Sequence, residues 1–368
     1  MAADGRAFWR SDWFFAVAVA TCALFWWSGG AFFASLSNPL ILAAIFGLLF
    51  VVILGSALSA VRHADHLAAH FGEPFGTLIL TLAVTFIEVM SISAIMLHGD
   101  PNPTLVRDTL LSVIMISLNG LVGLSLLTGA LRHKEQSYNL QGANAYLGLI
   151  LPLAVMSVVL PDYTVTSAGP TLSTQQRFVL ALFSIALYCG FLLIQTGRHR
   201  GYFTLGEEPG HEQRGAGGST VPFHVAMLTA YLVPVVYLAE QMAHPVDYVI
   251  ETLKQPTILG GVAIALLVTS PEGVSAVRAA RANHLQRSIN ILFGSVLSSI
   301  GLTVPIMLLI VYWYGLPITL GVEHADLVVL LLTLGLSIVT FSSGRTNALQ
   351  GGVHVLLFVT FLLLIVQG

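Results

Sequence analysis

Charged residues are scarce in this sequence. Only 9% of its 368 residues are Asp, Glu, Lys or Arg, while 56% are hydrophobic and the mean hydropathy is +0.85. Soluble domains carry about 25% charged residues, so this chain has too few charged side chains to cover a water-soluble fold. The shortage excludes a soluble globular protein and indicates an all-α polytopic membrane protein that is surrounded by the lipid bilayer.

Cysteine is also scarce, and no basic block is present. The two cysteines, Cys22 and Cys189, lie far apart in apolar runs, which excludes a disulfide framework and a metal site built on paired cysteines. The formal net charge is −3, and no cluster of Lys and Arg points to nucleic acid. We therefore expect neither a nucleic-acid partner nor a bound cofactor.

Long apolar runs are abundant instead. About 17–25 apolar residues suffice to cross the hydrocarbon core of a bilayer as a helix. Runs of this kind predict about eleven transmembrane helices, near residues 13–34, 39–61, 75–97, 108–131, 145–160, 177–196, 222–243, 257–277, 289–314, 326–342 and 350–367.

The basic residues indicate the orientation of these helices. If the N-terminus is cytoplasmic, twelve of the 15 Lys and Arg residues fall in cytoplasmic segments, and only Arg107, Arg177 and Lys254 fall outside. Cytoplasmic loops of membrane proteins carry such an excess of Lys and Arg, and losing one helix in mid-chain would destroy the bias. Eleven helices then place the C-terminus on the external side.

One short arrangement of residues occurs twice. The pattern Val-Thr-x-x-Glu at residues 84–88 recurs at 268–272, and residues 105–115 resemble 285–295. If the first helix is an extra one, the other ten form two sets of five. An odd number of helices per set gives the sets opposite orientations, the inverted repeat of many secondary transporters. The predicted parts are an N-terminal helix in 1–38, a first repeat at 39–196, a Gly-rich cytoplasmic linker at 197–221 and a second repeat at 222–368.

Glu88 and Glu272 carry the functional prediction. An ionised carboxylate at mid-bilayer costs several kcal/mol, so such residues usually face a cavity or a partner. Carboxylates from two pseudo-symmetric helices would meet near the midplane, where repeat-built transporters place their ion sites. No Lys or Arg within either run can neutralise them, which leaves protons or a cation. Thr85 and Thr269, one turn before each glutamate, could add hydroxyl ligands for a hard cation.

Polar side chains in the fourth and ninth predicted helices could complete a coordination shell. Small polar residues also line tightly packed interfaces between membrane helices, which is the simpler interpretation of each. The candidates are Ser112, Asn119, Ser295, Ser298 and Ser299.

Two longer segments, residues 72–89 and 270–305, resemble the calcium/cation antiporter superfamily, in particular the ChaA-type branch of the bacterial calcium/proton exchangers. The resemblance extends from about residue 55 to the C-terminus. It implies proton-driven export of Ca²⁺, and in this branch of Na⁺ or K⁺, through an inner-membrane protein with an inverted five-plus-five core behind one extra helix.

The sequence departs from the family pattern at the expected ligands. The wider family carries Gly-Asn-Ala-x-Glu in each repeat, whereas Thr85 and Thr269 stand at the Asn positions here, and Ser298 stands where the family has Gln. Hydroxyls are weaker ligands for a divalent ion than amide oxygens, which leaves room for a monovalent substrate.

A histidine-rich segment follows the second predicted helix. His63, His66 and His70 are spaced i, i+3 and i+7 with Asp65 between them, a spacing that suits a metal ion or a pH sensor. A solvated helix face is the simpler interpretation. The family resemblance covers this segment and adds Glu73 as a candidate gating residue.

Three functions stay open on the sequence alone. The first is a cation/proton antiporter without enzymatic activity, the second a membrane-embedded metal-dependent enzyme that uses the His/Asp cluster, and the third a passive cation channel. The repeated Thr-x-x-Glu and the lack of a continuous polar stripe favour the antiporter, with protons and Ca²⁺, Na⁺ or K⁺ as its substrates.

Overall fold

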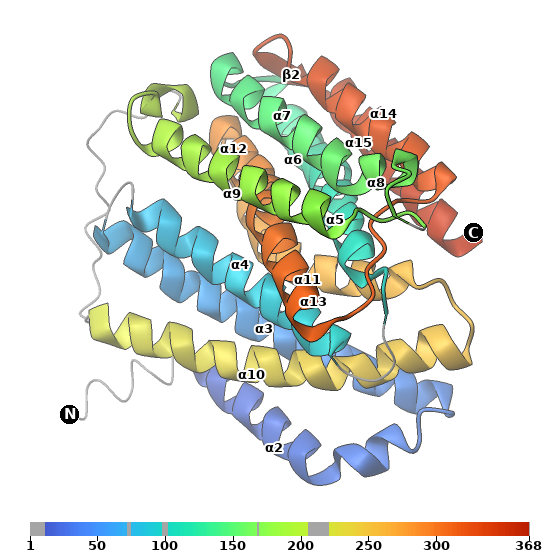
Figure 1. The fold of residues 1–368 in the computed structure, drawn as a ribbon. Helices are drawn as coiled ribbons and strands as arrows, with labels where there is room; N and C mark the ends of the chain where they lie inside the picture. The colour runs from blue at the N-terminus through green and yellow to red at the C-terminus, as the bar shows by residue number, and fades with distance from the viewer. Residues whose placement is uncertain (1–11, 72–74, 98–101, 168, 205–220, 368) are drawn as a thin grey trace, which may run out of the picture. The chain divides into compact units, whose positions relative to one another are not determined.

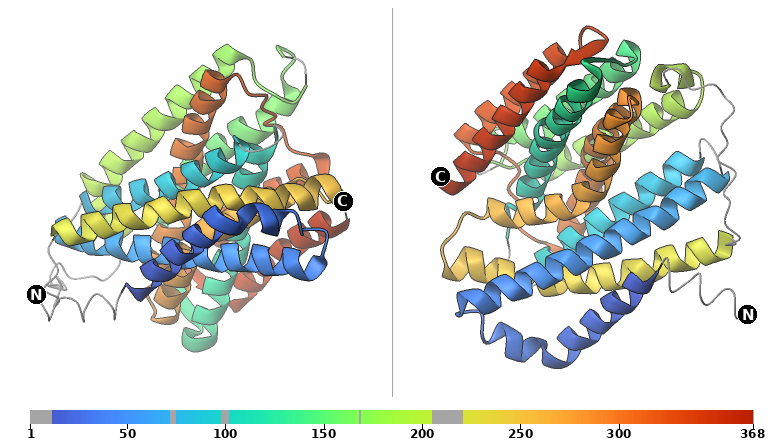
Figure 2. Two further views of the ribbon diagram at one scale, coloured as in Figure 1. Left: turned by 90° about the horizontal axis from the view of Figure 1, so that it is seen from below. Right: turned by 180° about the vertical axis from the view of Figure 1, so that it is seen from behind.

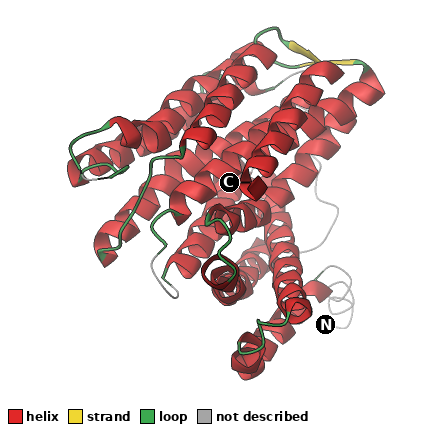
Figure 3. Ribbon diagram, turned by 90° about the vertical axis from the view of Figure 1, so that its right-hand side faces the viewer, coloured by secondary structure: helices red, strands yellow, loops and turns green. Residues whose placement is uncertain are grey.

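A computed structural model describes residues 12–71, 75–97, 102–167, 169–204 and 221–367 (Figure 1). These residues are helical apart from connections and one short antiparallel pair, β1 (Glu135–Ser137) with β2 (Arg345–Asn347) (Figure 3). The all-helical fold class is therefore confirmed. The chain forms two compact units, Met1–Pro101 with Glu212–Gln255 and Asn102–His211 with Pro256–Gly368. Each unit draws on both predicted repeats.

The first unit is built around one long helix. Its helices are α2 (Trp13–Phe33), α3 (Pro39–Phe71), α4 (Phe75–Met96) and α10 (Val221–Asp247), followed by the π-helical turn η4 (Tyr248–Thr252). The central helix, α3, contacts the other three and runs beside α10 (Figure 2). It has 33 residues, about 50 Å at 1.5 Å per residue, which exceeds a hydrocarbon core of about 30 Å. Its histidine-rich end is therefore a continuation of the membrane helix.

The second unit contains the remaining helices. In chain order they are α5 (Leu105–Met115), η1 (Ile116–Leu121), α6 (Val122–His133), α7 (Leu140–Ala154), η2 (Val155–Val159), α8 (Leu160–Tyr163), α9 (Thr174–Thr196), η3 (Arg200–Phe203), α11 (Ile258–Arg281), α12 (Leu285–Ser298), η5 (Ser299–Thr303), α13 (Val304–Tyr314), α14 (His324–Thr340) and α15 (Ala348–Gln367). The turns η1, η2 and η5 are π-helical and join their neighbours into continuous helices, whereas η3 is a 3₁₀ turn.

The membrane spans agree with the sequence prediction in position but not in every length. A helix occupies each of the eleven predicted ranges. Nine helices in the described part of the chain are long and apolar enough to cross a membrane. Two further apolar helices, α4 with 22 residues and α14 with 17, lie where the third and tenth spans are predicted. The exact count of eleven crossings and the inverted orientation of the repeats stay predictions.

Hydrogen bonds join four connections at one end of the second unit. Gln136 Nε2 donates to the Ala280 carbonyl at 2.8 Å, and Asn139 donates its backbone N–H to Gln286 Oε1 at 2.6 Å and its amide to the Gly201 carbonyl at 3.0 Å. Together with the pairing of β1 and β2, these bonds bring together the connections after α6, α9, α11 and α14. Part of the predicted linker, η3, is thus fixed to this end, while residues 205–220 lie outside the described residues.

The other connections of the second unit meet at the opposite ends of the same helices. Thr319 donates its backbone N–H to the Pro103 carbonyl at 2.8 Å, and Gly321 donates to the Pro170 carbonyl at 2.9 Å. Alternate connections along the chain therefore gather at alternate ends of the helices, as expected for consecutive antiparallel spans.

Candidate cation- and proton-binding site

Glu88 lies in the middle of α4 and is buried in the first unit. Its exposed fraction is 2% and that of Thr85, one turn earlier, is 3%. The helix contacts both α3 and α10. The Thr85 hydroxyl has no hydrogen-bond partner among the described residues, although leaving a buried hydroxyl unsatisfied costs about 1–3 kcal/mol. This oxygen is therefore available to a bound ion.

Glu272 lies in α11, directly after Pro271, and is half-buried in the second unit. Pro271 has no N–H, so the Leu267 carbonyl loses its usual helical donor. Thr269 donates its hydroxyl hydrogen to the Ala265 carbonyl at 2.7 Å. Because that hydrogen is used within the helix, the lone pairs of the Thr269 oxygen can face an ion.

The two halves of the predicted site lie in different compact units. The first unit holds Glu88 and Thr85, and the second holds Glu272 and Thr269. The meeting of the two glutamates near the bilayer midplane therefore stays a prediction from the sequence repeat.

The fourth and ninth predicted helices contain π-helical turns at related positions, η1 and η5. Such turns often occur at functional sites. The predicted polar candidates on these two helices are all buried, with exposed fractions of at most 5%: Ser112, Asn119, Ser295, Ser298 and Ser299. Ser112 donates to the Asp108 carbonyl at 2.6 Å, and Ser298 donates to the Ser295 carbonyl at 2.9 Å, so these two hydroxyls cap backbone carbonyls of their own helix.

Asn119 in η1 takes part in a buried network within the second unit. Its Nδ2 donates to Thr333 Oγ1 at 2.7 Å, and its Oδ1 lies 3.3 Å from His354 Nδ1. His354 Nε2 lies 3.0 Å from Thr340 Oγ1. Since an amide oxygen only accepts, the neutral His354 ring carries its hydrogen on Nδ1 and accepts from Thr340. His354 is not among the residues predicted from the sequence, although it is a single histidine within the apolar run of 350–367.

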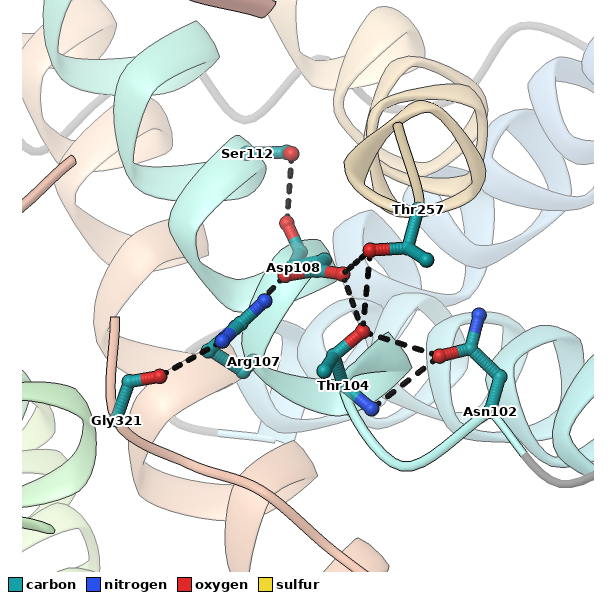
Figure 4. Close-up of polar contacts among 7 residues, drawn as sticks. All are labelled: Asn102, Thr104, Arg107, Asp108, Ser112, Thr257 and Gly321. Atoms are coloured by element: carbon teal, nitrogen blue, oxygen red, sulfur yellow. Dashed lines mark hydrogen bonds and ion pairs between the residues drawn. The ribbon is translucent and has the colours of Figure 1, made fainter. Parts of the chain in front are cut away.

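Asp108 is the centre of another network that the sequence analysis missed (Figure 4). Its side chain is 1% exposed. Oδ1 accepts a hydrogen bond from Arg107 Nε at 2.8 Å, and Oδ2 accepts one from Thr104 Oγ1 at 2.7 Å and another from Thr257 Oγ1 at 3.3 Å. Arg107 Nη1 also donates to the Gly321 carbonyl at 2.8 Å. The adjacent Arg107 and Asp108 at the end of an apolar run are the sequence feature that marks this network, and the charge bias of the loops alone does not reveal it.

The predicted histidine cluster includes partners that are distant in sequence. His63 Nε2 lies 3.0 Å from Asp12 Oδ1, and His63 Nδ1 lies 2.9 Å from His224 Nδ1 on α10. Arg62 Nη2 lies 2.6 Å from the same Asp12 oxygen. The His66 ring stacks on His224 with 4.6 Å between centroids. The cluster is thus a hydrogen-bonded chain that links the start of α2 to α3 and α10.

The other residues predicted for this segment are Asp65, His70 and Glu73. Asp65 and His70 are exposed, and Glu73 lies outside the described residues. Within the part of the chain that the structure describes, no three His, Cys, Asp or Glu side chains are arranged to hold a metal ion.

Comparison with known proteins decides the family. The model of the sodium/calcium exchanger protein family matches residues 41–197 and 223–367. The chain belongs to this family. The resemblance noted from the two Thr-x-x-Glu segments is thus confirmed, and the two matched ranges nearly coincide with the two predicted repeats.

Individual relatives support the assignment over nearly the whole length. The chain is 39% identical to the sodium-potassium/proton antiporter ChaA of Escherichia coli (strain K12) over 354 residues, which are 94% of each protein. It is 22% identical to the Ca²⁺/H⁺ antiporter ChaA of Bacillus subtilis (strain 168), over 70% of this chain and 77% of the relative. A solved structure of native YfkE shares the fold, with a TM-score of 0.74, 19% identity and coverage of 96% of this chain and 99% of that one.

Proposed function

We propose that this exchanger-family protein is a secondary active cation/proton antiporter. The observation that carries the proposal is the repeated Thr-x-x-Glu, which places a carboxylate and a threonine hydroxyl within an apolar helix of each matched range. Glu88 and Glu272 hold protons when the cation is absent, and the cation displaces those protons when it binds. Such a site binds either protons or the cation and opens to one side of the membrane at a time. It therefore couples the flux of the cation to the opposite flux of protons.

The polar groups around each glutamate define what the site accepts. Thr85 and Thr269 supply neutral oxygens, and the carbonyl of Leu267, freed by Pro271, supplies another. Oxygen ligands of this kind suit hard cations such as Ca²⁺, Na⁺ and K⁺. Hydroxyls at the positions where the family has amides favour a monovalent ion, in line with the sodium-potassium name of the Escherichia coli relative. The relative from Bacillus subtilis is named for Ca²⁺, so Ca²⁺ stays among the candidate cargoes.

The charge bias of the loops predicts the orientation of the chain, with the N-terminus cytoplasmic and the C-terminus external. The direction of transport, export of the cation in exchange for protons, is what the resemblance to the family implies. The His63 segment then lies at the cytoplasmic end of α3. There it regulates the exchange as a pH sensor or a gate and does not bind the cargo. Its residues are His63, Asp65, His66, His70 and Glu73.

Proton flux in reconstituted vesicles tests the function. Purified protein is placed in vesicles that contain a pH-sensitive dye, and Ca²⁺, Na⁺ and K⁺ are added separately. We expect at least one cation to drive proton movement in the wild type, and Glu88→Gln or Glu272→Gln to abolish it. Glu135→Gln is the matched control, because the Glu135 side chain is 62% exposed in β1. Full exchange by Glu88→Gln or by Glu272→Gln would overturn the proposal. Cation flux that moves no protons would also overturn it and would identify a channel.

A further inference from the structure

Helix α11 and helix α5 touch through their backbones at Gly261. A Cβ atom built on Gly261 would lie 2.5 Å from the carbonyl carbon of Asp108 and 2.6 Å from the backbone nitrogen of Thr109. Both distances are shorter than real side chains allow, and backbone atoms cannot move aside as the tip of a side chain can. Only glycine fits, so α11 is seated on α5 at the level of Asp108.

The Asp108 side chain makes a second contact with the same end of α11. Thr257, which precedes the first residue of α11, directs its hydroxyl to Asp108 Oδ2 at 3.3 Å (Figure 4). Arg107 occupies the other carboxylate oxygen and is itself fixed to the Gly321 carbonyl. Arg107 thereby holds the Asp108 carboxylate in one orientation and neutralises its charge, while the carboxylate accepts the hydrogen bond from Thr257.

The two halves of α11 are anchored separately. The far end of the helix is held at Ala280, whose carbonyl accepts a hydrogen bond from Gln136. Pro271 lies between these two anchors. It removes one backbone hydrogen bond from α11 and so weakens the helix beside Glu272. Helix α11 continues through Pro271 as one helix but lacks a backbone hydrogen bond at that point. The anchor at Thr257 therefore acts mainly on the half of the helix that ends at Glu272.

We propose that Asp108 is a positioning residue for the ion site, and that it sets the placement of Glu272 by fixing the Thr257 end of α11 on α5. The inference rests on the proposed antiport function and adds a residue to it. Glu272 follows Thr257 by fifteen positions, about 22 Å at 1.5 Å per residue. Asp108 therefore acts through the helix and does not touch the cargo.

A direct role for Asp108 as a cation ligand fits the geometry less well. Both of its oxygens are already engaged by Arg107, Thr104 and Thr257. A cation at this carboxylate would lie against the Arg107 guanidinium and would have to displace it. The arrangement therefore serves the backbone of α11, not an ion.

The test uses a pair of substitutions at Thr257, which is exposed enough to tolerate them. Thr257→Val removes the hydroxyl and keeps the shape, Thr257→Ser keeps the hydroxyl, and Thr174→Val removes an exposed threonine at the start of α9 as the matched control. Asp108→Asn provides the corresponding change on α5. Exchange kinetics and amide hydrogen exchange are measured on each full-length variant.

We expect faster amide exchange in one half of α11 and a weaker affinity for the cation, with no other change. Thr257→Val and Asp108→Asn speed amide exchange in 258–270 but not in 272–281. They also raise the KM for the cation with little change in kcat, about two- to tenfold for the loss of one hydrogen bond. Thr257→Ser and Thr174→Val behave as the wild type.

Two results would overturn the proposal. One is unchanged amide exchange in 258–270 in both Thr257→Val and Asp108→Asn, which would show that the contact does not hold the helix. The other is faster exchange with an unchanged KM, which would show that the anchor does not reach Glu272. A wild type that moves no protons with any cation would instead refute the antiport function, while amide exchange still reports on the anchor.

Discussion

The Nδ1 atoms of His63 and His224 lie 2.9 Å apart and join α3 to α10 through one hydrogen bond. One hydrogen, and only one, can lie between two ring nitrogens at this distance. His63 also directs Nε2 to the Asp12 carboxylate at 3.0 Å, and a neutral ring has a single N–H. His63 therefore donates to Asp12 and accepts from His224, so the bridge accommodates one additional proton but not two.

Acidification is predicted to open this bridge. Protonation of both rings would set two N–H groups against each other. The positive charges of the two rings and of Arg62 would then outnumber the carboxylates of Asp12 and Asp65 by three to two. His66 and Tyr231 also face these rings. We expect the thermal stability of the wild type to fall between about pH 7 and pH 5, where histidine takes up protons, and His224→Asn to flatten that dependence. His70→Gln is the control, because His70 is an exposed histidine on α3, the helix that carries His63. An equal pH dependence in the wild type and His224→Asn would contradict the prediction.

Cation selectivity is predicted to follow the residue one turn before each glutamate. Replacing both Thr85 and Thr269 by Asn restores the amide oxygens of the family pattern, which are better ligands for a divalent ion. The double variant should shift the ratio of Ca²⁺-driven to Na⁺-driven proton flux toward Ca²⁺, whereas Thr85→Ser with Thr269→Ser should leave the ratio near that of the wild type. A ratio that Asn leaves unchanged would show that these side chains do not contact the cargo.

Removing the His354 ring is predicted to destabilise the second unit. His354→Leu leaves the Asn119 amide oxygen and the Thr340 hydroxyl without their present partner, which costs about 1–3 kcal/mol for an unsatisfied buried group. His354→Gln retains one donor and one acceptor and should cost less. Thermal unfolding of the purified proteins measures the difference, and equal melting temperatures for Leu and Gln would argue against the network.

Gly261→Ala is predicted to be costly, unlike the same change elsewhere in the unit. The added methyl meets backbone atoms of Asp108 and Thr109 at 2.5–2.7 Å, so α5 and α11 must separate. Gly148→Ala in α7 meets nothing within 4 Å and should stabilise its helix by up to about 1 kcal/mol. The two melting temperatures should therefore move in opposite directions. A Gly261→Ala protein as stable as the wild type would mean that the two helices are not in backbone contact.

Local sequence patterns predicted those features of the fold that depend on local composition. Each apolar run became a helix, because in a bilayer every backbone polar group must be satisfied within its own segment. The burial of Glu88 and Thr85 followed from their place in the middle of such a run. The predicted span 39–61 covers only the apolar part of α3, which continues as a helix to Phe71, because apolar composition marks the membrane-crossing part of a helix and not its end.

The partners of the polar residues were beyond the reach of local patterns. His224 lies 161 residues from His63, and Gly321 lies 214 residues from Arg107. Neither pairing leaves a mark in the neighbouring sequence, since a hydrogen bond between helices needs only one suitable group on each. Asp108 was overlooked for this reason, while the repeated Glu88 and Glu272 were found because the chain carries the motif twice.

The pairing of β1 with β2 constrains the number of times the chain crosses the membrane. Strands that pair lie on one side of the bilayer, so the chain between Ser137 and Arg345 must cross an even number of times. Five long apolar helices of the described residues fall in that interval, and five is odd. We therefore predict that the short α14, with 17 residues, is the sixth crossing. Its modest length would then require a locally thinner bilayer or polar ends that reach the headgroups.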